Sequence, residues 1–161
     1  MIEAKDSAEE IKELREKIKV YEKLIEDLSA PIIPSILPET ILVPLTGALS
    51  VERFMHIQDK IVQRIASNAV HTVIIDFTEI GTLEVEEKMG YEPLSEKIHE
   101  LVSVLKLMGT ETLFVGFSPV FAQHLILSNV SDFNKIQAFT TFRMGLQYIM
   151  KQTGMEIVEK K

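Results

Sequence analysis

Four histidines are the first side chains to consider for acid–base or metal chemistry, because imidazole titrates near neutral pH and is a common metal ligand. They stand at His56, His71, His99 and His124. No two of them form an H-x-H or H-E-x-x-H pair, and none belongs to a cluster of histidines and carboxylates. Each is therefore interpreted as a surface or half-buried histidine, and the sequence predicts neither a metal site nor a histidine-based active site.

Other patterns that support catalysis or phosphate binding are equally scarce. The sequence has no G-x-x-x-x-G-K-[ST], G-x-G-x-x-G or G-x-S-x-G motif, and no cysteine to serve as nucleophile or ligand. Gly116-Phe-Ser-Pro119 is typical of a strand-to-helix turn that can meet an anion, but no basic residue accompanies it, so helix capping by Ser118 is favoured. Asp76 ends an apolar run and suits either a catalytic acid or a loop cap. We expect a protein that is not an enzyme and needs no cofactor.

Composition limits the class of partner. The chain has 161 residues, enough for one domain, and 46% are hydrophobic, enough for a core. Its 17 basic and 24 acidic residues give a net charge of −7, which argues against binding the phosphate backbone of nucleic acids. No run of about 18 apolar residues predicts a membrane span, and the polar start MIEAKDSAEE does not resemble a signal peptide. We therefore expect a soluble, cytoplasmic protein with no nucleic-acid or membrane partner.

The first 28 residues differ in kind from the rest of the chain. Fifteen of them are charged, and none is glycine or proline. Their apolar residues follow a 3-4 spacing: Ile11, Leu14, Ile18, Tyr21, Ile25 and Leu28. This is the a/d pattern of a heptad repeat, and isoleucine at each a position favours a parallel two-stranded coiled coil. The alternative is an amphipathic helix packed on its own domain. The sequence favours a coil that dimerises through these six residues.

The remaining chain alternates between strand and helix patterns. Three prolines end the first helix and restrict the segment 31–37 to an edge strand. Further strands are predicted at 41–45, 72–76, 112–116 and 135–139, and helices at 51–67, from Gly90 to Met108, from Ser118, and at 141–152. The second of these helices has the core face Leu94, Ile98, Leu101, Val102 and Leu105, and a polar insertion at 84–90 precedes it. Strands that alternate with helices indicate the α/β class.

An ordered series of short motifs resembles a known family. The motifs are Leu28-Ser-Ala-Pro-Ile-Ile-Pro34, Val43-Pro-Leu-Thr-Gly-Ala-Leu49, Val73-Ile-Ile-Asp-Phe-Thr78, Leu107-Met-Gly109 and Phe114-Val-Gly-Phe-Ser-Pro-Val-Phe-Ala-Gln123. Together they resemble a STAS domain, and more narrowly the C-terminal half of the RsbR-type co-antagonists of the bacterial stressosome. The resemblance covers residues 28–150. In that family a helical linker ends in a similar L-S-x-P-[IV]-[IV]-P run.

The resemblance implies a SpoIIAA-like α/β fold, with a mixed sheet of about five strands and four helices preceded by a coiled-coil-like helix. It divides the chain into a helical linker at 1–29, a STAS domain at 30–152 and a C-terminal tail at 153–161. It also implies a non-enzymatic scaffold that sequesters a serine/threonine switch kinase and so controls an alternative sigma factor. The implied partners are a second copy of the chain, related S-type STAS proteins and that kinase. RsbR-type chains usually carry a sensory domain ahead of the linker helix. The present sequence includes the linker helix but not a sensory domain.

The family's phosphorylation site is altered in this sequence. RsbR-type proteins are typically phosphorylated within a D-[ST] pair after the third strand, whereas this sequence has no such pair and its equivalent position falls near Glu84 or Val85. The remaining candidates for a regulatory or phosphoacceptor residue are Thr78, Thr82 and Ser95. Glu84 is a further regulatory candidate, because it belongs to an acidic run that would imitate a permanently charged phosphorylation site. We expect Ser95 in the first turn of the following helix. The switch is therefore expected to be altered or lost.

The resemblance also assigns an interaction surface to the start of the third domain helix. Its residues are Ser118, Gln123 and His124, and His124 occupies the second position that some relatives phosphorylate. Two alternatives remain. One is a small-ligand or nucleotide-binding STAS module, with a pocket between Thr46-Gly47, the loop 76–82 and the turn 116–119. The other is a simple anti-sigma factor antagonist.

Overall fold

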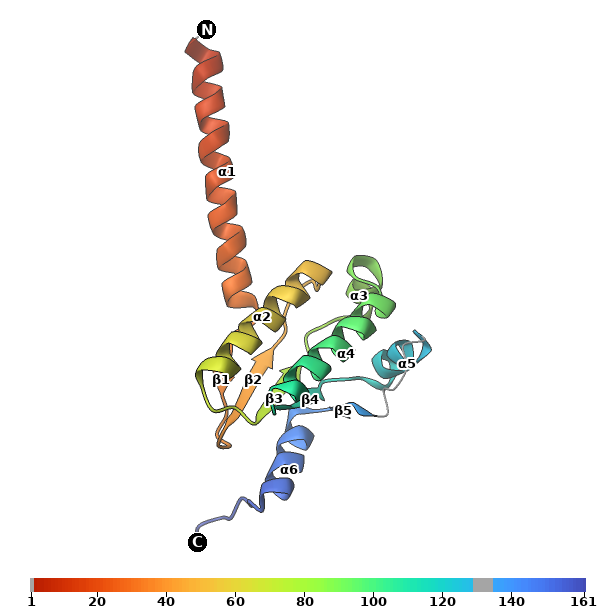
Figure 1. Cartoon of the computed structure of the whole chain (residues 1–161). Helices are drawn as coiled ribbons and strands as arrows, with labels where there is room; N and C mark the ends of the chain where they lie inside the picture. The colour runs from red at the N-terminus through yellow and green to blue at the C-terminus, as the bar shows by residue number, and fades with distance from the viewer. Residues whose placement is uncertain (1, 129–134) are drawn as a thin grey trace.

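The computed structural model describes residues 2–128 and 135–161, and shows a long helix that projects from an α/β domain (Figure 1). The elements follow in the order α1 (Ile2–Ser29), β1 (Ile33–Pro34), β2 (Thr40–Pro44), α2 (Val51–Ser67), β3 (Thr72–Asp76), α3 (Thr82–Lys88), α4 (Tyr91–Leu107), β4 (Glu111–Val115), α5 (Pro119–Leu127), β5 (Gln137–Phe139) and α6 (Phe142–Thr153). This order confirms the predicted α/β class and the predicted N-terminal helix.

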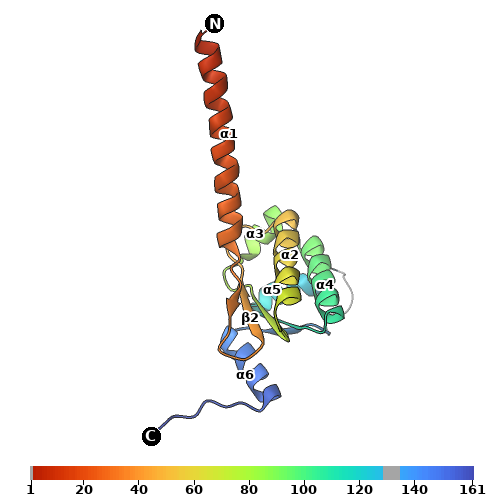
Figure 2. The same ribbon diagram turned by 60° about the vertical axis from the view of Figure 1, so that its left-hand side comes forward.

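The sheet is mixed, with the strand order β1-β2-β3-β4-β5 among the described residues. β1 runs antiparallel to β2, and the other neighbouring strands are parallel. Because the parallel strands are neighbours in sequence order, right-handed crossovers place the helices between them on one face of the sheet. Figure 2 shows α2 and α4 side by side on that face, whereas α6 lies on the other face.

Two layers of apolar side chains hold the domain together. The larger layer lies between the sheet and the helices α2 to α5, and the smaller one lies under α6, where Ile74, Leu113 and Ile149 meet. At the carboxyl ends of β3 and β4 the larger layer is aromatic. Its rings belong to Phe77, Phe114, Phe117 and Phe121, and the ring centroids of contacting pairs lie 5.0–6.0 Å apart. These rings anchor the loops that follow the two strands, since each loop begins beside one of them.

α1 is attached to the domain through the cationic side chain of Lys60. Its Nζ donates hydrogen bonds to the carbonyl oxygens of Asp27, at 3.2 Å, and Ala30, at 2.9 Å. The last turn of α1 contains no basic residue of its own. Lys60 of α2 therefore supplies the positive charge that favours a helix C-terminus.

Several details differ from the sequence-based expectations. The stretch 84–90, expected as an insertion, is largely the helix α3, so the described residues form five helices after α1 rather than four. It forms because 82–88 lacks glycine and proline, and Val85 is 1% exposed in the core. Gly90, with φ of +84°, then separates α3 from α4. The predicted edge strand 31–37 is reduced to two residues, because proline has no N–H to donate to the ladder.

The predicted helix starts are confirmed by their capping hydrogen bonds. Ser50 Oγ accepts the N–H of Arg53 at 3.1 Å, and Ser118 Oγ accepts the N–H of Phe121 at 3.1 Å, with Pro119 in the first turn. Val102, expected in the core, is only partly buried. None of the helices in the described residues is long and apolar enough to span a membrane.

Candidate functional site

Thr78 lies two residues after the end of β3, in the loop that the resemblance assigns to the switch. Asp76 Oδ1 accepts the backbone N–H of Thr78 at 2.8 Å and its hydroxyl at 2.5 Å. Asp76 therefore caps the loop, as one of the two sequence interpretations proposed. Thr78 is exposed, and its hydroxyl is oriented by this carboxylate.

The turn after β4 lies directly against that loop. Gly116 has φ of +82°, and a β-carbon on it would come within 2.6 Å of Thr78 Oγ1. Glycine is required here for two reasons, the backbone conformation and the close approach of Thr78. The contact brings together loop 76–82 and turn 116–119, two of the three segments between which the sequence-based alternative placed a ligand pocket.

α3 contains Glu84 and Val85, the residues nearest to the phosphorylation position that the resemblance implies. Val85 points into the core, while Glu84, Glu86 and Glu87 are exposed around it. Thr82 is the first residue of α3 and is partly exposed. Of the two residues nearest the phosphoacceptor position that the resemblance implies, Val85 is buried and apolar and Glu84 belongs to an acidic surface.

Tyr91 connects the three helices of this region. Its hydroxyl donates to the carbonyl oxygen of Thr82 at 3.3 Å, and its ring stacks on His124 with centroids 4.7 Å apart and an interplanar angle of 15°. Its ring also contacts Phe121 edge-on. Burial, with a smaller effect of the Glu86 charge, raises the pKa of Tyr91 above its ordinary value. Sequence reasoning missed Tyr91, because only the tertiary fold brings it to α5.

Ser95, a phosphoacceptor candidate from the sequence, is inaccessible in this structure. It is 0% exposed and lies in the second turn of α4, on the face that packs inward. Its Oγ accepts a hydrogen bond from Ser128 Oγ at 3.0 Å. The expectation of a residue in the first turn is therefore wrong, and a kinase would reach Ser95 only if α4 opened.

The remaining predicted residues gather at one end of the domain. Ser118 and Gln123 are exposed on α5, and His124 is half-buried against Tyr91. We define the switch surface by the following residues: Thr78, Thr82, Leu83, Glu84, Ser118, Gln123 and His124. Leu83 was not singled out from the sequence, although it is 71% exposed. An apolar side chain surrounded by charged groups is suited to contact a protein partner.

α1 carries a second exposed surface. Its six heptad residues, Ile11, Leu14, Ile18, Tyr21, Ile25 and Leu28, are between 50% and 70% exposed. The apolar row is therefore not covered by the chain's own domain. Figures 1 and 2 show from two sides that α1 projects from that domain. We call this row the α1 stripe.

The four histidines do not gather at a common site. His71 Nε2 lies 3.0 Å from Glu39 Oε2 at the surface, His99 Nδ1 lies 3.0 Å from the carbonyl oxygen of Ser95, and His56 is exposed. Within the described parts of the chain, no three histidine, aspartate or glutamate side chains are arranged to hold a metal ion.

The domain that carries these residues has the fold of STAS domains. A variant of RsbS from Moorella thermoacetica matches with a TM-score of 0.61 at 16% identity, over 78% of this chain and 98% of that one. A chain from the molecular architecture of the stressosome, a signal integration and transduction hub, matches with a TM-score of 0.59 at 16% identity, over 78% of this chain and all of that one. At this level of identity the likeness establishes the fold. No protein-family model matches the sequence.

The sequence relationship is more specific. The chain is 26% identical over 134 residues to the RsbT co-antagonist protein RsbRB of Bacillus subtilis, which covers 83% of this chain and 45% of the relative. The chain is therefore homologous to a stressosome co-antagonist and has the fold of STAS domains, and it spans about half the length of that relative. The predicted resemblance is confirmed.

Proposed function

We propose that this protein is a non-enzymatic scaffold of a stress-response assembly of the stressosome type, acting in the cytoplasm. The α1 stripe is the observation that carries the proposal. A 28-residue helix is about 42 Å long at ~1.5 Å per residue, and six apolar side chains along it remain exposed. Burying such a row favours association, since the hydrophobic effect scales with the apolar area removed from water.

The first partner is a second copy of this chain. The 3-4 spacing of the stripe, with isoleucine at each a position, suits a parallel two-stranded coil. Three heptads are marginal alone, so we expect the coil to depend on the domain that Lys60 joins to it.

The second class of partner comprises related S-type STAS proteins and a serine/threonine switch kinase. Homology to an RsbT co-antagonist and the stressosome-like fold support this assignment. We assign kinase docking to the switch surface, where exposed Leu83 lies beside acidic Glu84 on α3.

The phospho-switch is altered or lost in this proposal. A phosphate adds about −1.5 to −2 charges to a docking surface, which changes its affinity for a partner. Here Val85 offers no hydroxyl and is buried, and the exposed carboxylates of Glu84, Glu86 and Glu87 keep the surface permanently acidic. Thr78 and Thr82 are the accessible hydroxyl groups of the loop and α3 that remain.

Kinase retention tests the proposal. The full chain is mixed with an S-type STAS protein and the switch kinase, and the kinase is measured in the high-mass fraction after size-exclusion chromatography. We expect retention with the wild-type chain and with Ile126→Asp, an exposed α5 control, and loss of retention with Leu83→Asp while assembly persists. A kinase that elutes alone from the wild-type mixture would contradict the docking assignment.

A further inference from the structure

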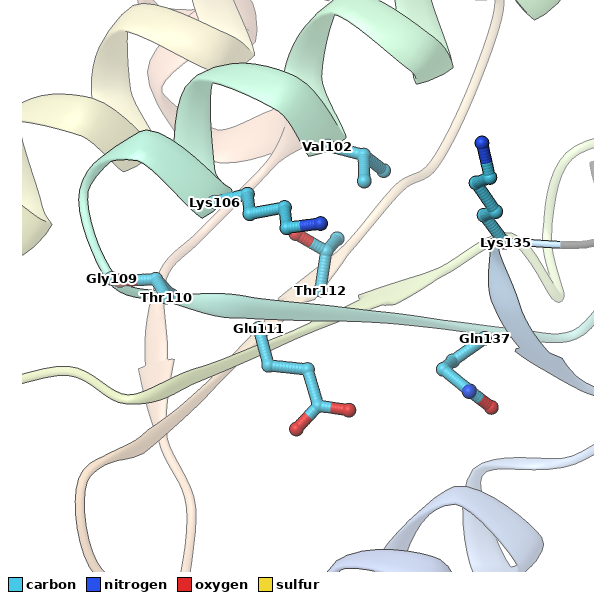
Figure 3. Close-up of a pocket in the computed structure, with 8 residues that line it drawn as sticks. All are labelled: Val102, Lys106, Gly109, Thr110, Glu111, Thr112, Lys135 and Gln137. Atoms are coloured by element: carbon cyan, nitrogen blue, oxygen red, sulfur yellow. The ribbon is translucent and has the colours of Figure 1, made fainter. Parts of the chain in front are cut away.

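A cleft opens at the end of the sheet opposite the switch surface. It lies where α4 ends and β4 and β5 begin, with a volume of about 430 Å³ (Figure 3). The side chains of Val102, Lys106, Thr112 and Lys135 line it, together with Gly109. Pockets for small molecules start at roughly 300 Å³, so the cleft has the size for a small metabolite.

Thr112 provides the strongest indication of a ligand. It is only 7% exposed, and its Oγ1 is a buried oxygen with no hydrogen-bond partner in the structure. Figure 3 shows this hydroxyl on the same side of β4 as the ammonium group of Lys106. A buried hydroxyl without a partner is destabilising, and such groups are rare in folded proteins unless something else satisfies them.

Two of the three charged residues that line the cleft, Lys106, Glu111 and Lys135, are basic, although the whole chain carries a net charge of −7. Lys106 and Lys135 rise on the α4 side of the sheet, whereas Glu111 and Gln137 point to the opposite side (Figure 3). On that opposite side Glu111 Oε1 accepts a hydrogen bond from the Tyr148 hydroxyl at 3.5 Å. The carboxylate at this position therefore faces away from the two ammonium groups.

We propose that this cleft binds a small anion with a phosphoryl group, either free phosphate or a phosphorylated metabolite. The phosphoryl oxygens would accept hydrogen bonds from Lys106, Lys135 and the Thr112 hydroxyl, and charge-assisted bonds of this kind are the strong ones. The volume exceeds that of one phosphate ion, and Val102 and Gly109 offer a neutral wall for an organic part. The site is independent of the scaffold function proposed above.

NMR titration of the full, isotopically labelled chain tests the site. The probes are inorganic phosphate, ribose 5-phosphate and, as the neutral match, ribose. We expect saturable shifts of the Gly109 and Thr112 amide signals with one or both phosphate probes and none with ribose. Shifts with inorganic phosphate alone identify free phosphate as the ligand, and tighter binding of ribose 5-phosphate identifies a phosphorylated metabolite.

Three variants locate the site. Lys106→Gln is expected to weaken binding by about tenfold or more, because it removes a charged hydrogen-bond donor. Thr112→Val is expected to weaken binding several-fold and to leave the ligand-free protein as stable as before or more so, because the deleted hydroxyl has no partner. Lys151→Gln, on exposed α6, is the matched control and should bind as the wild type does.

Three results would overturn the inference. The first is the absence of amide shifts with either phosphate probe at millimolar concentration. The second is equal binding by Lys106→Gln and Lys151→Gln, which would indicate attraction to lysines in general. The third is a loss of stability of ligand-free Thr112→Val, which would show that the hydroxyl has a structural partner.

Discussion

Gly116 and Thr78 touch across the carboxyl ends of β3 and β4, and a β-carbon on Gly116 would lie 2.6 Å from Thr78 Oγ1. The contact joins loop 76–82 to the turn that starts α5. Asp76 holds the same threonine from its other side. The position of Thr78 therefore depends on both strands, and a substitution at Gly116 should displace Thr78 and loop 76–82.

Gly116→Ala is expected to destabilise the domain by about 2–4 kcal/mol, since it combines the strain of a positive φ with a steric clash. Denaturant unfolding measures this change. Gly154→Ala separates the two effects, because Gly154 has φ of +69° and nothing within 4 Å of an added β-carbon. We expect that control to cost only about 1 kcal/mol. Equal losses in the two variants would contradict the clash with Thr78.

The α1 stripe is expected to hold two copies together. Ile18→Asp combined with Ile25→Asp places two carboxylates in the coil and should give a monomer at all accessible concentrations, as read by sedimentation equilibrium. Val20→Asp is the matched control, because Val20 is 64% exposed on α1 but lies outside the a/d positions. A dimer that survives the double substitution would show that the domain, not the coil, holds the pair.

Phosphorylation is expected to be absent or to fall on a new residue. Incubation with the switch kinase and ATP should leave the intact mass unchanged if the switch is lost, since a phosphate adds about 80 Da. An adduct that disappears in Thr82→Ala would instead show an altered switch at the start of α3. A stoichiometric adduct on buried Ser95 would contradict the placement of that residue in the core.

Tyr91 is expected to make stability depend on pH under alkaline conditions. Its pKa is raised in the folded state, so the unfolded chain loses the phenolic proton first. The stability is fully present below the unfolded pKa of about 10, and it is lost as the pH rises through the folded pKa. Denaturant unfolding across this range should show the loss in the wild type and a smaller loss in Tyr91→Phe.

Tyr148→Phe is a second variant for comparison with Tyr91→Phe, because burial and the neighbouring Glu111 also raise the pKa of Tyr148. It should reduce the alkaline loss independently of Tyr91→Phe, since the two tyrosines lie on opposite faces of the sheet. Identical profiles for the wild type and Tyr91→Phe would contradict the raised pKa of the half-buried Tyr91.

Local signals in the sequence are sufficient to predict much of the fold. Ser50 and Ser118 mark helix starts through hydrogen bonds within one turn, and the apolar runs ending at Asp76 and Val115 are buried strands. Such features depend on neighbours in the chain, so composition and spacing are enough to predict them.

The arrangement of residues at the switch surface could be described only from the tertiary structure. α3 was missed because its helical periodicity is short and strongly acidic, so burial of Val85 is the one signal that distinguishes it from a loop. Ser95 was misplaced because the helix begins at Tyr91, which sets the face that turns inward. The stacking of Tyr91 on His124 and the contact of Gly116 with Thr78 join residues that are far apart in sequence, and no local pattern encodes them.

Light scattering tests the scaffold function most directly. The chain is measured alone and after mixing with an S-type STAS protein from the same organism. We predict a dimer alone and a particle of far higher mass in the mixture, with both species absent for the variant that carries aspartate at positions 18 and 25. A wild-type chain whose mass is unchanged by the S-type protein would contradict the scaffold function, and the homology to a co-antagonist would then describe descent and fold alone.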